Sequence, residues 1–492
     1  MKVKNNLEIK IKSIQKYFWL YILISSFPVI SYGQAEIDSL LNNARYEIGK
    51  MSFRNAVKYL NEVEKIDSLN PMLIYLHSEM KLIYGEEDFL KYFEKLRSVG
   101  ADELYHVMKL KHAVFIGLSE SKILLQKYLE NYPENGEIKF VQWLLELDDG
   151  KYEICMKSAD EISKGTIFKV APYLALFNAS WDNNYKNAIT YIDTVEQIIK
   201  REFYGSKYRE ILEVLSNTET IDLNNGKSEL PFAWCGPGVG YYMIDEKGDS
   251  LRIKMDTGTG FNLMTVHDKA LGERTSGIDI LVVENGISYN YMDKPADLYY
   301  KKSNFSIPAY RNFIFGYFDS QLIKADGCAS PFVFKNRALH IDPINEKVYL
   351  LDHENLEKYI NDNKDIIEKV PYIVRNGWIY VPCKINGTEV LMQIETGSRD
   401  VNFYTLSLDP LGLESYPSSI EWNGQDFPID KVDCILEIGS IKYEVKGGLV
   451  ADRVFANWYY GLAAAGDIGP FFMNKFVFTI DMINQQIIFE IK

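Results

Sequence analysis

Two acidic residues in matching surroundings are the positions where this sequence is best equipped for chemistry. Asp256 ends an apolar run and opens Asp-Thr-Gly-Thr, and Glu395 ends a second run and opens Glu-Thr-Gly-Ser. In each motif the glycine lets the backbone turn tightly and pass close to a neighbour. If the two turns meet face to face, their carboxyl groups share one proton, because two acids that close do not both ionise. One acid then acts as a base on water while the other hydrogen-bonds a substrate carbonyl.

The spacing between the two acids, 139 positions (395 − 256), recurs along the second half of the chain. Eleven pairs of identical residues stand at this offset, whereas ordinary composition gives about three over the same windows. The sequence therefore predicts an internal duplication, with one carboxylic acid at the same place in each of two β units. The pairs are Gly238/Gly377, Tyr241/Tyr380, Gly248/Gly387, Thr257/Thr396, Gly258/Gly397, Pro331/Pro470, Phe332/Phe471, Ile341/Ile480, Asp342/Asp481, Ile344/Ile483 and Asn345/Asn484.

These motifs resemble those of the pepsin/retropepsin class of aspartic peptidases, with both lobes on one chain, from about residue 231 onward. The family's Asp-Thr-Gly-Ser/Thr motif is matched fully at Asp256, and in everything but the acid at Glu395. Later in each lobe the family carries two apolar residues and a glycine, then an apolar helix and an Ile-Asp strand. Asp467 stands in one of those apolar places, and Ser330 stands where the first glycine is expected.

The resemblance implies a bilobal all-β domain that hydrolyses peptide bonds between Asp256 and Glu395, without metal or other cofactor. It also implies hydroxyl groups that bond the two carboxylates, others that tie the lobes together, and a hairpin that closes over the substrate as a flap. A surface hairpin with no role is the alternative for the flap. The supporting residues are Thr257, Gly258 and Thr259 in the first turn, Thr396, Gly397 and Ser398 in the second, and Asn285, Gly286 and Tyr289 in the flap.

Two other functions remain open at this stage. Glutamate is one methylene longer than aspartate, which shifts the carboxyl by roughly 1.5 Å, and a misplacement of about 1 Å at a catalytic site can cost on the order of 100-fold. Glu395, Ser330 and Asp467 therefore favour a catalytically degenerate protein that binds peptides as an adaptor. A dimerisation or scaffold element would explain the duplication, but not the Thr-Gly-Ser/Thr sequence after each acid.

The first 33 residues predict an export signal. Five lysines precede an apolar run over 17–24, and a small-residue exit follows at Ser31-Tyr-Gly33. The run is short for a membrane span of about 20 residues, so we expect a periplasmic or extracellular protein, with an uncleaved N-terminal anchor as the alternative. Removing the five lysines and Glu8 takes the formal charge from −14 to −18. That acidity disfavours nucleic acid and anionic membranes as partners.

The stretch 34–220 predicts amphipathic helices, because its apolar residues recur at helical spacing, as from Phe53 to Leu60. An aromatic residue precedes a small one by three positions at Phe53, Tyr152 and Tyr185. Their separations of 99 and 33 are close to multiples of the roughly 34-residue tetratricopeptide period. The region resembles a degenerate tetratricopeptide array of about five helix pairs; ordinary helix packing is the alternative. The five cysteines form no CxxC motif, and their odd number leaves at least one unpaired within the chain.

The expected organisation is a helical repeat domain followed by a β domain built from two homologous repeats. A polar linker over 217–227 separates the domains, and Lys247-Gly248 and Asn386-Gly387 predict hairpin turns before the two acids. We interpret the chain as an exported aspartic-type endopeptidase whose helical domain presents a peptide or protein substrate or docks a protein partner, without an integral membrane domain. The predicted boundaries are 1–33 for the signal peptide, 34–220 for the helical domain, 228–352 for lobe 1, 353–370 for a helical connector and 371–492 for lobe 2.

Overall fold

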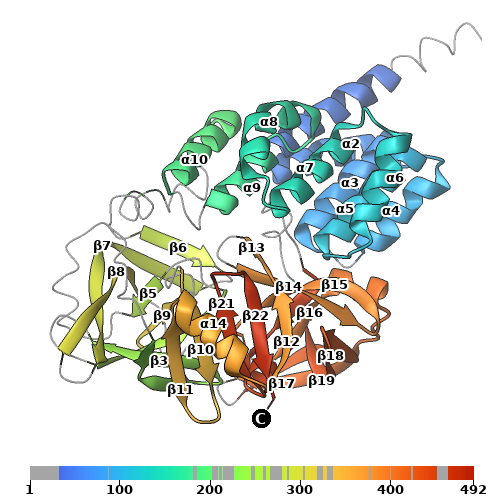
Figure 1. The fold of residues 1–492 in the computed structure, drawn as a ribbon. Helices are drawn as coiled ribbons and strands as arrows, with labels where there is room; N and C mark the ends of the chain where they lie inside the picture. The colour runs from blue at the N-terminus through green and yellow to red at the C-terminus, as the bar shows by residue number, and fades with distance from the viewer. Residues whose placement is uncertain are drawn as a thin grey trace, which may run out of the picture.

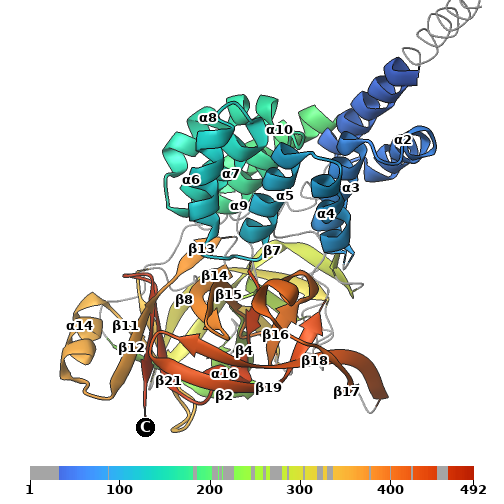
Figure 2. The same cartoon turned by 90° about the vertical axis from the view of Figure 1, so that its right-hand side faces the viewer.

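An α-helical region and a β-rich region follow one another along the chain and lie side by side in space (Figure 1; Figure 2). The protein therefore combines α and β structure in more than one domain. The computed structural model describes residues 33–86, 88–180, 185–201, 209, 213, 227–244, 250–258, 262–265, 280–284, 287–302, 305–317, 325–329, 336–375, 378–398, 400–422, 425–451 and 464–491.

The helices of the N-terminal region pack through apolar faces. Phe53, Tyr152 and Tyr185 each open a helix, and the small residue three positions later is buried in every case. Asparagine caps two of the helices, since the side chains of Asn70 and Asn135 accept hydrogen bonds from the first free N–H groups of α3 and α7. After a helix over 33–49 come α2 (Phe53–Ile66), α3 (Pro71–Tyr84), α4 (Phe89–Ser98), α5 (Asp102–Phe115), α6 (Ser121–Asn131), α7 (Gly136–Asp148), α8 (Tyr152–Gly165), α9 (Ala171–Ser180) and α10 (Tyr185–Ile199).

Two eight-stranded sheets in the β-rich region have the same strand order, position by position. Their parallel pairs correspond as well, since β4–β9 and β5–β8 in one sheet match β15–β20 and β16–β19 in the other. The first sheet runs β2 (Phe232–Cys235), β3 (Gly238–Ile244), β4 (Ser250–Met255), β9 (Gly327–Ala329), β5 (Asn262–Thr265), β8 (Phe305–Tyr317), β7 (Ile287–Lys302), β6 (Ile280–Glu284). The second runs β13 (Ile373–Arg375), β14 (Trp378–Ile385), β15 (Thr388–Ile394), β20 (Gly466–Ile468), β16 (Val401–Tyr404), β19 (Ile441–Ala451), β18 (Gln425–Ile438), β17 (Tyr416–Trp422).

A six-stranded sheet joins the two halves of this region. At its centre β10 pairs with β21 antiparallel, so that His340 lies opposite Thr479, 139 positions later, and their side chains meet at 3.0 Å. Asp342 and Asp481 each accept main-chain N–H bonds from the turn that follows, so these matched acids have a structural role. The sheet runs β1 (Ser228–Leu230), β11 (Lys347–Leu351), β10 (Ala338–Asp342), β21 (Val477–Asp481), β22 (Gln486–Glu490), β12 (Ile366–Pro371).

The connector between the halves differs from the prediction. A helix was expected through Lys369, but α14 covers only His353–Asp362, and β12 follows it. Ile366 and Ile367 are β-branched, a type that suits strands, and β12 pairs with β22 as the edge strand of the six-stranded sheet. Tertiary pairing therefore outweighs the helical character of the charged sequence. The other short helices are η3 (Thr405–Ser407), η4 (Asp409–Leu411) and α16 (Pro470–Met473).

All five cysteines are buried free thiols. Burial raises the pKa of Cys235 to about 11 and that of Cys434 to about 12, so these thiols stay protonated and behave as small apolar side chains. In the part of the chain that the structure describes, no helix is long and apolar enough to cross a membrane.

The helical region docks directly on β15, the strand that leads to Glu395. In the segment between α5 and α6, Leu118 forms a β-bridge with Val390, and the main chain on either side of that bridge is hydrogen-bonded to β15 at 2.9 and 3.2 Å. Nearby, His112 on α5 donates from Nε2 to the carbonyl of Leu406 at 3.0 Å. The position of the acid-bearing strand therefore depends in part on the helical region.

We predict that acid weakens this contact. Burial lowers the pKa of His112 to about 4, against its ordinary value of 6.5, while the bond to Leu406 and the charge of Asp409 raise it. Because the unfolded chain takes up the proton first, the stability that neutral His112 contributes is present above pH 6.5 and is lost as the pH falls toward 4. The shift corresponds to about 3 kcal/mol. Urea unfolding followed by circular dichroism at several pH values measures this loss.

His112→Gln retains a hydrogen-bond donor but does not titrate. Over the same pH interval its free energy of unfolding is expected to fall by about 3 kcal/mol less than that of the wild type. His353→Gln is the matched control, because that imidazole is exposed at the start of α14. Equal losses in the wild type and in His112→Gln would contradict the prediction.

Candidate functional site

The two acidic residues occupy equivalent places at the ends of β4 and β15. The N–H of Asp256 donates to the carbonyl of Ala329 at 2.9 Å, and the N–H of Glu395 donates to the carbonyl of Ile468 at 3.0 Å. Each acid therefore begins its turn beside the short parallel strand that follows later in the same sheet. The offset between these two acceptors is again 139 positions (468 − 329).

Within each turn the glycine N–H holds its own acid. Gly258 donates to Oδ1 of Asp256 and Gly397 donates to Oε1 of Glu395, both at 3.0 Å. A hydrogen bond to a carboxylate oxygen fixes the orientation of the acid. The two turns thus present their carboxyl groups in the same way.

Thr257 and Thr396 lock the two turns together. The N–H of each threonine donates to Oγ1 of the other at 2.9 Å. Each hydroxyl then donates across the seam, Thr257 to the carbonyl of Ile394 at 2.6 Å and Thr396 to that of Met255 at 3.0 Å. Both side chains are buried. We call these four bonds the threonine network.

The network brings each acid against the opposite glycine. A Cβ atom added to Gly258 would lie 1.6 Å from Oε2 of Glu395, and one added to Gly397 would lie 2.5 Å from Oδ2 of Asp256. A side chain at either glycine would thus occupy the space of a carboxyl group. The structure therefore places the two predicted acids at one seam, with their oxygens facing the partner turn.

Lys254 and Gln393, two positions before the acids, belong to the same site, although we did not predict them from the sequence. Lys254 is buried and donates from Nζ to the carbonyl of Gly397 at 2.9 Å. Gln393 is buried as well and donates from Nε2 to Oε2 of Glu395 at 2.9 Å. The signal that could have found them is a polar residue two positions before each acid, at the common offset of 139 positions (393 − 254).

Trp378 completes a reciprocal arrangement. Its Nε1 donates from β14 to the carbonyl of Gly258 at 2.8 Å, as Lys254 does to the carbonyl of Gly397. Each sheet thereby satisfies the glycine carbonyl of the turn carried by the other sheet. Buried carbonyl groups need such partners, so both residues position the turns.

Two other predicted features have a physical explanation in the structure. Asp467, in a place expected to be apolar, accepts hydrogen bonds from Asn402 at 2.7 Å and from Tyr404 at 3.4 Å, so its buried carboxylate is satisfied. Ser398 differs from the expectation, because its hydroxyl donates to the main-chain carbonyl of Glu395 at 2.9 Å and not to the carboxylate. Its hydroxyl therefore braces the turn through the main chain.

The remaining predicted residues have no described side chains. Thr259, Ser330, Asn285 and Gly286 lie outside the described residues. Tyr289 is on β7, where its backbone pairs with Val282 of β6 in the antiparallel arrangement expected of a hairpin. Among the described residues, no group of three or more histidine, cysteine or acidic side chains could hold a metal ion.

No protein-family model matches the chain, and no curated protein sequence matches it either.

The threonine network predicts a large cost for Thr257→Val. Valine has nearly the same shape, but it leaves the carbonyl of Ile394 and the N–H of Thr396 buried without these partners. An unmade buried hydrogen bond costs about 1–3 kcal/mol, so we expect the free energy of unfolding to fall by about 2–4 kcal/mol in urea titrations.

Thr190→Val is the matched control, because that hydroxyl is exposed and bonds only within α10; we expect a change within about 0.5 kcal/mol. The free energy of unfolding of the double variant Thr257→Val/Thr396→Val should fall by less than the sum of the two single-variant losses, because the two residues share hydrogen-bond partners. A loss in Thr257→Val no greater than in the control would show that the network does not hold the seam.

Proposed function

We propose that this protein is an exported aspartic-type endopeptidase. The observation that carries the proposal is the pair of equivalent turns, in which each acid lies against the glycine of the other turn and buried threonines hold both in register. Such an arrangement suits the activation of one water molecule between Asp256 and Glu395. The matching strand order of the two eight-stranded sheets supports a bilobal peptidase-like domain of two homologous repeats.

In the proposed reaction the two acids share one proton. The ionised acid removes a proton from the water, whose oxygen attacks the carbonyl carbon of the peptide bond, while the protonated acid hydrogen-bonds the carbonyl oxygen. In the second step the C–N bond breaks, a proton passes from the acid pair to the leaving amine, and a free carboxylate and an amine result. No metal and no covalent intermediate enters this scheme.

Two hydrogen bonds accommodate the longer side chain of Glu395 in the site. Gly397 holds Oε1 and Gln393 holds Oε2, so both oxygens are oriented by N–H donors from the second sheet. Gly258 leaves open the space that Oε2 fills. These contacts favour a modified active site over a decayed one, because a well-oriented carboxylate offsets the extra methylene.

The helical region supports the remainder of the proposal. The pattern of an aromatic residue followed three positions later by a small residue falls at the starts of α2, α8 and α10, as expected for a degenerate tetratricopeptide array. In such an array the helices present a substrate or dock a protein partner. Its contact with β15 at Val390 supports a helical region that acts together with the strand leading to Glu395.

A second candidate function is a peptide-binding adaptor without catalysis. The observation that favours it is the buried side chain of Asp467, which Asn402 and Tyr404 satisfy as a structural group in a place that is apolar in the peptidases. The contacts of Glu395 then serve to hold the cleft in shape. The two candidates differ in whether the acid pair breaks a bond.

The test is hydrolysis of a mixed peptide library by residues 34–492 over a range of pH, with products identified by mass spectrometry. We expect cleavage by the wild type, and a loss of at least about 100-fold in Asp256→Asn, because the amide cannot act as the acid or base. Asp352→Asn is the matched control, since that acid caps α14 away from the two turns; it should cleave like the wild type.

Glu395→Asp separates the two candidates. Cleavage by the wild type that Asp256→Asn removes establishes the peptidase and an Asp/Glu pair as its site. If the wild type cleaves no peptide but Glu395→Asp does, the fold is intact and the active site has decayed. If the wild type and all folded variants cleave no peptide, the peptidase proposal is wrong and the peptide-binding adaptor is favoured.

A further inference from the structure

Arg252 lies on β4, four positions before Asp256, and its main chain is held by a single aspartate. The N–H of Arg252 donates to Oδ2 of Asp326 at 2.8 Å. The N–H of Asp326 donates back to the carbonyl of Arg252 at 2.7 Å. Asp326 directly precedes β9. The first sheet therefore completes this part of its acid-bearing strand with its own residues.

The second sheet has an alanine in the equivalent place. Leu391 and Ala465 stand 139 positions after Arg252 and Asp326 (391 − 252 and 465 − 326). The N–H of Ala465 donates to the carbonyl of Leu391 at 2.9 Å, which repeats one of the two bonds of the first sheet. A methyl group cannot accept a hydrogen bond. The N–H of Leu391 therefore needs an acceptor from another part of the chain.

The helical region supplies this acceptor. The carbonyl of Gly117, between α5 and α6, accepts the N–H of Leu391 at 2.9 Å. In the next position Leu118 forms its β-bridge with Val390, and both of these side chains are buried. A bond that the first sheet makes with its own carboxylate is thus made in the second sheet with a carbonyl of the helical region.

A second contact of the helical region lies close to the same alanine. The side chain of Ala465 is fully buried, and its carbonyl accepts the hydroxyl of Ser407 at 2.8 Å. The residue before that serine, Leu406, is the one whose carbonyl accepts Nε2 of His112 at 3.0 Å. Both contacts therefore reach the second sheet at Ala465 or at residues one hydrogen bond away from it.

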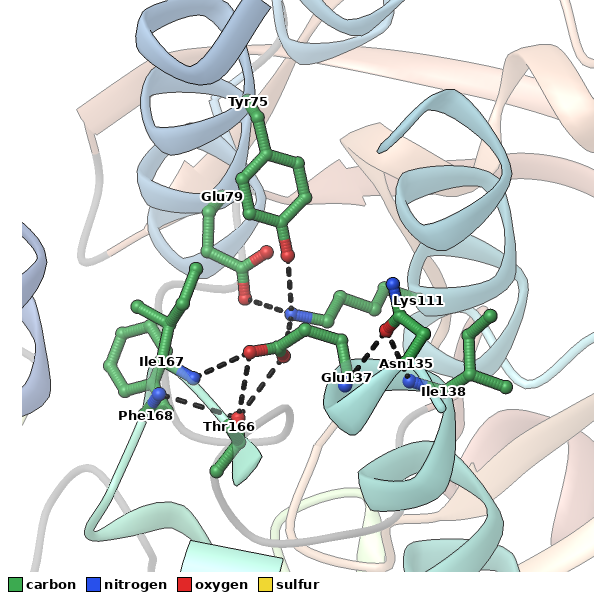
Figure 3. Close-up of polar contacts among 9 residues, drawn as sticks. All are labelled: Tyr75, Glu79, Lys111, Asn135, Glu137, Ile138, Thr166, Ile167 and Phe168. Atoms are coloured by element: carbon green, nitrogen blue, oxygen red, sulfur yellow. Dashed lines mark hydrogen bonds and ion pairs between the residues drawn. The ribbon is translucent and has the colours of Figure 1, made fainter. Parts of the chain in front are cut away.

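The helix that carries these contacts is fixed within its own region (Figure 3). Nζ of Lys111 on α5 lies 2.6 Å from a carboxylate oxygen of Glu79 on α3 and 2.6 Å from one of Glu137 on α7. It also donates to the hydroxyl of Tyr75 at 3.2 Å. Breaking a buried ion pair is costly, because a buried charge is left uncompensated. Gly117 follows the end of α5 by two positions, so its carbonyl is offered from a fixed base.

We propose that the segment 117–119 of the helical region is a positioning element for Glu395. It holds β15 four positions before the acid, in the place where Asp326 holds β4 before Asp256. A misplacement of about 1 Å at a catalytic group can cost on the order of 100-fold in rate, so a loosened β15 lowers catalysis. The effect on catalysis rests on the proposed peptidase function, whereas the positioning of the strand does not.

Hydrogen–deuterium exchange at single-amide resolution, on residues 34–492, tests the proposal without a substrate. Gly117 has a φ of 67°, so Gly117→Val places a β-branched residue in the left-handed region and displaces the segment. We expect the N–H groups of Leu391 and Gly397 to exchange about 10-fold faster in this variant. Gly397 reports on the acid itself, because its N–H donates to Oε1 of Glu395.

Gly100→Val is the matched control. Gly100 also has a positive φ, 73°, and lies in an exposed turn before α5, where an added Cβ would meet no described atom within 4 Å. Exchange at Leu391 and Gly397 should stay at the wild-type rate in this control. The N–H of Arg252 is the internal reference, and its exchange should be unchanged in both variants.

Two further measurements distinguish positioning from general stability. Ala465→Asp, added to Gly117→Val, provides a carboxylate in the second sheet and should slow the exchange of Leu391 at least about threefold. Ala465→Val in the same background adds volume without an acceptor and should not slow it. On a peptide that the wild type cleaves, Gly117→Val should lower kcat at least about 10-fold, with KM within about twofold of that of Gly100→Val.

If Gly117→Val does not fold by circular dichroism, Ser119→Pro replaces it. Proline cannot donate the hydrogen bond that the N–H of Ser119 makes to the carbonyl of Glu389 at 3.2 Å. The same exchange pattern at Leu391 and Gly397 is expected.

Three outcomes would overturn the proposal. They are equal exchange at Leu391 in the segment variant and the control, faster exchange at Leu391 without a change at Gly397, and an active enzyme whose kcat the segment variant leaves unchanged. If no protein cleaves a peptide, the peptidase function fails, and the exchange rates alone decide whether the segment positions Glu395.

Discussion

The threonine network is the interaction on which the rest of the candidate site depends. Its four bonds cross a buried seam between two separately formed sheets, and each threonine supplies both a donor and an acceptor to the other. The seam therefore has one register in which every group is satisfied, because a shift of either turn leaves buried polar atoms unpaired. Lys254 and Trp378 add further hydrogen bonds across the seam, because each donates to a main-chain carbonyl of the opposite turn. The approach of the two acids follows from this fit and needs no direct attraction between them.

Much of this arrangement could be predicted from the sequence, because it rests on local signals repeated at one offset. The Asn386-Gly387 turn has positive φ at both residues, 49° and 87°, as a two-residue hairpin requires. Asp342 and Asp481 stand at the common offset, and each accepts hydrogen bonds from its own turn. Other features depend on partners distant in the chain. The strand β12 exists because β22 offers an edge, and the roles of Lys254 and Gln393 depend on the opposite or adjacent turn.

Helix α5 links the two parts of the molecule. Nζ of Lys111 lies 2.6 Å from a carboxylate oxygen of Glu79 on α3 and 2.6 Å from one of Glu137 on α7, and the next residue, His112, donates to the carbonyl of Leu406 in the β-rich region. Successive residues on a helix face directions about 100° apart, so one helix serves both contacts without bending. The end of the same helix leads straight into the segment that bridges to Val390. The buried ion pairs of the helical region, the contact between the regions and the bridge to the acid-bearing strand therefore all involve one helix and the segment that follows it.

The bridge between Leu118 and Val390 also has a consequence for how the chain can be divided. Strand β15 lies between β14 and β20, and β20 pairs with its last two residues, Gln393 and Ile394. Nearer its start, the N–H of Leu391 and the carbonyl of Glu389 are hydrogen-bonded to Gly117 and Ser119. A fragment restricted to the β-rich region would lose these two partners and leave both groups of β15 unpaired. The helical region is therefore part of the hydrogen bonding that completes this sheet.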